Sequence, residues 1–156
     1  MMFFQDALYP QCAHLMRHHV IGIQPDTQVY RAMMECIADR SLVDLALSAG
    51  TYPRLIIARL TRNGYWARNV GGNYGGECDP AILNYVYINK NVAEGVEEGN
   101  LSSRYFEQVL LHEVVHWGRH LAGLPAEIEG REAGSWFEHL AYGVPYIGHS
   151  GVSCTA

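Results

Sequence analysis

The chain has 156 residues, the size of one compact domain, and 49% hydrophobic and 17% charged residues are typical of a globular protein. Sixteen acidic against eleven basic residues give a formal charge of −5, and no stretch combines clustered Lys or Arg with aromatic residues, so no nucleic-acid partner is expected. No apolar run approaches the roughly 20 residues that cross a bilayer, and polar residues interrupt the first twenty positions, so we expect neither a membrane span nor a signal peptide.

The first part of the chain, up to about residue 50, is predicted to be rich in helix. Apolar residues recur three and four positions apart between Thr27 and Leu47, which predicts one or two amphipathic helices. Asp26 or Thr27 is the expected N-cap, and Gly50 ends this block. The four cysteines form no CxxC pair, so we expect buried or free thiols.

The middle of the chain is predicted to form a small antiparallel or mixed sheet. The pair Asn63-Gly64 favours a tight hairpin turn between the apolar runs Leu55–Ile57 and Tyr65–Trp66. The glycine-rich segment 71–76 is expected to be a long turn or a flap without regular structure. Residues 82–89 are rich in β-branched and aromatic side chains, which predicts a strand.

Two helices are predicted after a loop that contains Gly95 and Gly99. The first runs from about residue 104 to 122 and ends at Gly123, and the second from about 131 to 142, ending at Gly143. The sequence therefore predicts a single α+β domain over residues 1–156. Its helix-rich part covers about 1–50, and its sheet and active-site part about 51–156.

The first of these two helices carries an HExxH motif, His112-Glu113-Val114-Val115-His116. Residues four apart lie one helical turn above each other, so the two imidazoles can bind one zinc ion. Glu113 lies beside this pair, where it can take a proton from a water molecule that the ion activates. The motif predicts a zinc-dependent hydrolase with one Zn²⁺ per chain and Glu113 as the general base.

A catalytic zinc site needs a third protein ligand and an open position. His120 is too far along the helix, and the third histidine of the metzincin pattern is absent because position 122 is alanine. The following helix offers Glu132 and Glu138, which lie about 240° apart around a helix, so both cannot face one ion. Because the chain must first reverse direction, we favour Glu138 as the third ligand and keep Glu132 as the alternative.

Three segments, 85–93, 110–119 and 132–143, together resemble the metallopeptidase toxin domains at the C-terminal ends of bacterial polymorphic toxins and of type VI secretion effectors. The downstream run Glu132-Ala-Gly-Ser-Trp-Phe-Glu138-His-Leu-Ala-Tyr-Gly143 is more particular than the HExxH core. The resemblance covers about half of the chain.

This resemblance implies a zincin fold of the gluzincin type, with the two motif histidines and a glutamate from the 132–138 run as ligands. Clostridial neurotoxin light chains are similar in placing a glycine five residues after the ligand glutamate, as Gly143 follows Glu138. The resemblance also implies a peptidase that is made in the cytoplasm, exported by a specialised secretion system and active in a target cell, with a cognate immunity protein.

Substrate contacts are expected from several further residues. The resemblance places the strand 85–89 at the edge of the cleft, where an extended peptide could add to it. His149, Tyr146 and Tyr142 lie downstream, where they could contact the substrate or stabilise its oxyanion.

Two other functions remain open from the sequence alone. The chain could be a regulatory or housekeeping intracellular zincin protease. It could also be a non-catalytic binding module stabilised by metal, in which His139 or His149 completes four protein ligands and leaves no position for water.

Overall fold

The computed structural model describes residues 1–156 except 51, 63–64, 67–69, 77–78 and 148–156. In chain order the elements are β1 (Met2–Phe3), α1 (Pro10–Leu15), a π-helical turn η1 (Met16–Val20), α2 (Gln28–Ile37), α3 (Arg40–Ala46), β2 (Arg54–Ala58), β3 (Thr61–Arg62), β4 (Tyr65–Trp66), β5 (Gly72–Tyr74), a 3-10 turn η2 (Pro80–Ile82), β6 (Tyr85–Asn89), α4 (Lys90–Glu97), α5 (Ser103–Leu121), β7 (Glu127–Ile128), β8 (Arg131–Glu132) and α6 (Ala133–Tyr142). None of the described helices combines the length and apolar character needed to cross a membrane. The predicted α+β class is confirmed.

The helix-rich beginning of the chain is confirmed. The Thr27 hydroxyl accepts a hydrogen bond from the Tyr30 amide and caps α2, as one of the two predicted N-caps. A left-handed residue, Ala38, ends α2, and the Asp39 carboxylate starts α3 by accepting from two backbone amides. The thiols of Cys12 and Cys36 are free and buried, so burial raises the pKa of each to about 12.

The main sheet has the strand order β1-β2-β6-β5, with β1, β2 and β6 parallel and β5 antiparallel to β6. Leu55 and Ile57 of β2 are buried beside Val86 and Ile88 of β6. The prediction that Leu55–Ile57 forms a hairpin with Tyr65–Trp66 is therefore wrong. Tyr65–Trp66 pairs instead with Thr61–Arg62, and the predicted turn at 63–64 lies outside the described residues.

Strand β5 corrects the expectation that residues 71–76 lack regular structure. A side chain at Gly72 would place its Cβ 2.8 Å from the Tyr87 carbonyl oxygen, so glycine is what lets this strand approach β6 closely. β6 itself starts at Tyr85, because Pro80–Ile82 forms the 3-10 turn. β6 is paired on both sides, by β2 and β5. A peptide therefore cannot add to β6 as expected. In the part of the chain that the structure describes, β5 is the edge strand next to β6, and β1 is the edge on the far side of the sheet.

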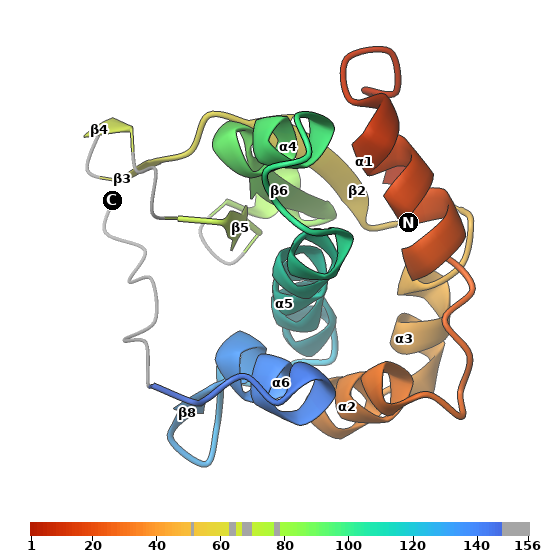
Figure 1. Cartoon of the computed structure of the whole chain (residues 1–156). Coiled ribbons are helices and arrows are strands. Elements are labelled where there is room, and N and C mark those ends of the chain that lie inside the picture. The colour runs from red at the N-terminus through yellow and green to blue at the C-terminus, as the bar shows by residue number, and fades with distance from the viewer. Residues whose placement is uncertain (51, 63–64, 67–69, 77–78, 148–156) are drawn as a thin grey trace.

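Helix α5 runs through the middle of the molecule, with the sheet and α4 on one side and α6 and α2 on the other (Figure 1). The Ser102 hydroxyl caps it by accepting from the Tyr105 amide. Its fully buried apolar side chains point in several directions around the axis: Phe106, Leu110, Leu111, Val114, Val115 and Trp117. These positions cover about half of the helix circumference, so one side of α5 is packed in the core and holds the backbone that carries the motif.

Helix α6 packs against α5 after a reversal of the chain through the short hairpin of β7 and β8. It begins at Ala133 rather than at Arg131, and the left-handed Gly143 ends it as predicted. Gly95, which we expected in a loop, lies inside α4. The short hairpin decides which glutamate reaches the motif on α5.

Candidate metal centre

The two motif histidines lie one turn apart on α5, with their ring centroids 5.1 Å apart. Their side chains are 18% and 14% exposed, so the rings border solvent at the surface of an otherwise buried helix. Both rings present Nε2 toward the start of α6, where Glu132 lies. The motif therefore offers two imidazole nitrogens to one point.

Glu132 supplies a carboxylate at that point. Its Oε1 contacts His116 Nε2, and its Oε2 lies 3.7 Å from His112 Nε2. The same carboxylate is the N-cap of α6, because it accepts from the amides of Gly134 at 3.0 Å and Ser135 at 2.6 Å. These bonds fix the side chain, which is 6% exposed, so Glu132 is aimed at the histidines before any ion binds.

The donor atoms of His112, His116 and Glu132 all lie within 4.8 Å of one another, and among the described residues this is the group of three that could hold a metal ion. Ligand atoms of a tetrahedral zinc ion, each about 2.0–2.1 Å from the metal, lie about 3.4 Å apart. Only small shifts are needed to reach that spacing. Two imidazoles and one carboxylate also leave a fourth position open, so the residues present fit a divalent ion with a place for water.

Glu138 lies on the other side of His112. The Nδ1 of His112 donates to Glu138 Oε1 at 2.7 Å, and Gln108 Nε2 donates to Glu138 Oε2 at 2.9 Å. The structure therefore brings Glu132 into the three-residue group. Glu138, favoured from the sequence, contacts instead the Nδ1 of His112, which faces away from that group. A carboxylate at this nitrogen fixes the tautomer of a metal-binding histidine.

Glu113 is 7% exposed, and its Oε1 lies 4.0 Å from His112 Nε2, beside the group but outside it. Its other neighbour is the edge strand, since a Cβ at Gly72 would lie 3.0 Å from Glu113 Oε1. Burial raises the pKa of Glu113, and the two histidines partly offset that rise. A carboxylate between the metal group and the edge strand is placed to exchange a proton there.

The charges of the group suit a bound cation. Burial alone would lower the pKa of His112, but the hydrogen bond to Glu138 and the charges of Glu113 and Glu132 outweigh it and raise that pKa to about 9. Burial raises the pKa of Glu132, but the hydrogen bond from His116 and the charges of both histidines outweigh it and hold that pKa well below its usual range. The carboxylates around His112 therefore favour a positive charge at this ring, and a divalent ion can supply that charge in place of a proton.

The residues expected to contact substrate are placed differently from one another. The Tyr142 hydroxyl donates to Glu107 Oε1 at 2.7 Å, so its hydrogen is already used. The Tyr146 hydroxyl accepts from the Glu132 amide at 3.0 Å and so lies beside the third carboxylate. His149 lies outside the described residues.

His139 was one of two histidines expected to complete a closed metal site as its fourth protein ligand. Its Nδ1 lies 2.9 Å from the Val144 carbonyl oxygen, and its ring stacks on Trp136 at 5.0 Å between centroids. Among the described residues the metal group has three members, and His139 is not one of them.

Two glycines that the sequence reading did not single out let the site close. A Cβ at Gly134 would lie 2.4 Å from both Cδ2 and Nε2 of His112, so α6 can lie against the imidazole only with glycine there. Gly72 has the same role at Glu113, where a Cβ would lie 2.8 Å from Cγ. For Gly134 the sequence signal is its position two residues after Glu132, the N-cap of α6. This signal can be recognised only when Glu132 is known to be the cap.

Arg119 was also missed, and it holds the reversal between α5 and α6. Its guanidinium donates to the carbonyl oxygens of Pro125 at 2.7 Å and Glu127 at 3.0 Å, and also to that of Cys36 at the end of α2. The residue is 6% exposed, and burial lowers its pKa. Because it anchors the hairpin that leads to Glu132, Arg119 helps to place the third carboxylate.

Comparison with known proteins agrees with this geometry. The sequence model of the family described as metallopeptidase toxin 3 (Tox-MPTase3) matches residues 5–143. Searches of curated proteins and of solved structures found no match. The matched range contains all three members of the metal group and confirms the resemblance drawn from the sequence. With a matched segment that covers most of its length and a metal group on an HExxH helix, the chain belongs to the metallopeptidase toxin 3 family and is a metallopeptidase toxin domain.

Proposed function

We propose that the chain is a zinc-dependent peptidase that hydrolyses a protein or peptide substrate, with His112, His116 and Glu132 as the metal ligands and Glu113 as the general base. The observation that carries this proposal is the convergence of three donor atoms within 4.8 Å, with a second buried carboxylate, that of Glu113, beside them. Two imidazoles and a carboxylate are a donor set that catalytic zinc takes in peptidases.

Zinc is the metal that this donor set supports best. When bound, the ion supplies a Lewis acid that lowers the pKa of water to about 7 and polarises a carbonyl group. The chain supplies the geometry: Glu132 is fixed by the amides at the start of α6, and His112 is fixed by Glu138. Gln108 in turn holds Glu138, so His112 is oriented by a short chain of hydrogen bonds.

Glu113 performs the proton transfers. Its carboxylate accepts a proton from the attacking water as the new C–O bond forms at the scissile carbonyl. It then delivers that proton to the amine nitrogen as the C–N bond breaks, so that the carboxylate is regenerated and the products are an acid and an amine. Burial raises the pKa of Glu113, which makes its carboxylate a stronger base for that proton.

The edge strand β5 is the proposed platform for the substrate. Among the described residues β5 pairs with β6 on one side only, and Gly72 lies directly against Glu113. An extended peptide could pair with the other side of β5 through main-chain hydrogen bonds alone. Its backbone would then lie close to Glu113. Such binding requires no particular side chain close to the cut bond. Tyr146, beside the Glu132 amide, is the described candidate for an oxyanion contact.

Delivery and protection follow from the family rather than from the site. Membership of a toxin family supports delivery into target cells. We propose a specialised secretion system, such as the type VI system, as the route, and a cognate immunity protein in the producing cell. The intracellular housekeeping protease and the closed binding module have no specific observation in their favour.

The test is expression of the chain in the cytoplasm or the periplasm of a susceptible bacterium, with zinc content and proteolysis measured on purified protein. We expect toxicity in at least one compartment and loss of toxicity and proteolysis in Glu113→Gln, which keeps the fold and the zinc. Glu94→Gln, which alters an exposed carboxylate paired with Lys90, is the matched control and should remain active. A folded and fully active Glu113→Gln protein would remove the general base from the mechanism.

A further inference from the structure

Three exposed histidines gather on the first helical segment, away from the metal group. His14 lies at the end of α1, and His18 and His19 lie on the π-helical turn η1 that continues it. The rings of His14 and His18 are 4.5 Å apart between centroids, and those of His14 and His19 are 6.2 Å apart. For comparison, the two histidines of the HExxH motif are 5.1 Å apart. The exposed pair is therefore set as closely as a pair in the proposed zinc site.

The π-helical turn is what brings the third ring to this face. In an α-helix, residues five apart differ by about 140° around the axis, so His14 and His19 would point in different directions. Here the Ile21 amide donates to the Met16 carbonyl oxygen at 2.9 Å, five residues back, so the turn is wider. A wider turn returns residues four and five apart to the same side. Isolated π turns of this kind occur frequently at functional sites.

The segment is anchored while its histidines remain free to turn. Met16 and Val20 are buried in the core at 2% and 0% exposure, which holds the backbone. Arg17 is drawn away by an ion pair with Asp6, so its positive charge is partly neutralised. The three histidine nitrogens do not yet lie within 4.8 Å of one another, so coordination needs a rotation of exposed side chains. Rotamer changes of that kind cost little at a surface.

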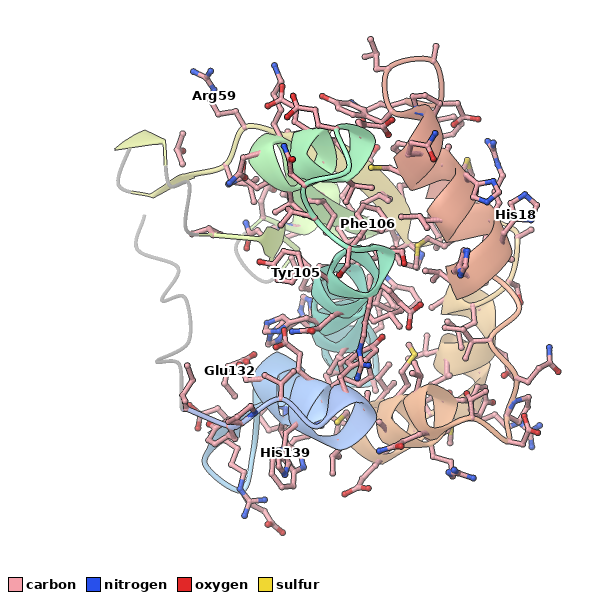
Figure 2. The ribbon with its side chains drawn as sticks, in the orientation of Figure 1. His18, Arg59, Tyr105, Phe106, Glu132 and His139 are labelled. Atoms are coloured by element: carbon pink, nitrogen blue, oxygen red, sulfur yellow. The ribbon has the colours of Figure 1, made fainter. Side chains whose placement is uncertain are left out.

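We infer that His14, His18 and His19 form a second metal-binding site, which takes a late first-row divalent cation such as Zn²⁺, Ni²⁺ or Cu²⁺. Imidazole is a preferred ligand of these ions. Figure 2 shows His18 at the right-hand edge of the view and Glu132 on the opposite side. The second site is thus remote from the metal group on α5 and α6, and it does not depend on the proposed function. Being exposed, it should bind more weakly than the buried group.

The inference is tested by isothermal titration calorimetry, in which zinc is titrated into the metal-free chain of residues 1–156 at neutral pH. We expect the wild type to bind two ions, one tightly and one more weakly, and the triple variant His14→Ala, His18→Ala, His19→Ala to bind only the tight one. His116→Ala should lose the tight ion and keep the weak one, so failure of the proposed zinc centre and failure of this inference are distinguishable. Equal uptake by the wild type and the triple variant would overturn the inference.

A single variant tests the contribution of the π turn. Loss of a direct ligand costs at least as much as loss of its outer partner, so His19→Ala should weaken the second site by at least about tenfold. Gln11→Ala, an exposed change on the same helix, should leave it unchanged and serves as the control. If His19→Ala binds the second ion as tightly as the wild type, the site is not the three-histidine site inferred here. Thermal unfolding of each metal-free variant checks that the fold is retained.

Discussion

Replacement of Gly134 by alanine should disable the metal centre without unfolding the chain. The new Cβ would lie 2.4 Å from Cδ2 and Nε2 of His112, about 1 Å short of the 3.4 Å at which ordinary contact begins. Neither partner can move freely, since Glu132 binds the Gly134 amide and Glu138 holds His112 Nδ1. The imidazole must therefore shift by about 1 Å. A misplacement of that size costs about 100-fold in rate, and disturbance of a ligand's support costs about 10–100-fold in metal affinity.

The measurements are zinc affinity by competition with a chelator, proteolysis with zinc in excess, and thermal unfolding of the metal-free protein. Overpacking should also lower the free energy of unfolding by about 1–3 kcal/mol. Gly118→Ala is the matched control, because its Cβ would lie 2.7 Å from Ile37 Cδ1 in the apolar core and not from a ligand. The control should lose stability and keep zinc affinity. A Gly134→Ala protein that binds zinc as tightly as the wild type would refute this reasoning.

Four further predictions address the residues around the metal group. Gly72→Ala should displace Glu113, whose Cγ would lie 2.8 Å from the new Cβ, and steady-state kinetics should show a lower kcat with the zinc content unchanged; an unchanged kcat would contradict the contact. Glu138→Gln should weaken zinc binding by about 10–100-fold, since a neutral amide supports His112 less than a carboxylate, and chelator competition measures this against the wild type. Zinc affinity should rise by up to about tenfold per pH unit between 6.5 and about 9. The reason is that the pKa of His112 is raised to about 9, so below that pH the metal-free protein holds a proton on His112 that the ion must displace. A pH-independent affinity would show that His112 is already neutral. Arg119→Lys should lower the free energy of unfolding by about 1–3 kcal/mol, because a compact ammonium group cannot reproduce the planar fork of donors that reaches three separate carbonyl groups. The change should also weaken zinc binding, whereas stable protein with unchanged affinity would remove Arg119 from the placement of the third ligand.

The local parts of the site could be predicted from sequence because they depend on local geometry. Residues four apart on a helix share a face, so the HExxH pair and the helix that carries it follow from spacing alone. The caps at Thr27, Ser102 and Gly143 also follow from local chemistry. These are interactions within a few residues of one another, where the sequence order and the spatial order agree.

The choice between the two candidate glutamates depended on how the chain reverses. We assumed that a helix must run some turns beyond the loop before it faces its neighbour, which favoured Glu138. The chain reverses instead through the hairpin of β7 and β8, whose strands have two residues each and which Arg119 anchors. This hairpin places Glu132 directly before α6, opposite the motif. Arg119 joins α5 to carbonyl groups of the reversal between α5 and α6 and to a carbonyl group at the end of α2. These contacts are not evident from any local sequence pattern.

The sheet shows the same limit. The Asn63-Gly64 signal assigned both neighbouring apolar runs to one hairpin, but β2 pairs in parallel with β6 some thirty residues later. Parallel pairing leaves no turn signature between its partners. β5 was missed because glycine disfavours strands in general, whereas here the close approach to the Tyr87 carbonyl and to Glu113 requires it.

The central claim is that His112, His116 and Glu132 hold a zinc ion with one position open to water. The most direct measurement is an anomalous difference map at the zinc absorption edge from crystals of the zinc-loaded chain. We predict a strong peak about 2.0–2.2 Å from Nε2 of each histidine and from a Glu132 carboxylate oxygen, with no fourth protein ligand. A peak bound to Glu138 in place of Glu132, a closed sphere of four protein ligands, or a well-folded chain without zinc at this position would contradict the account.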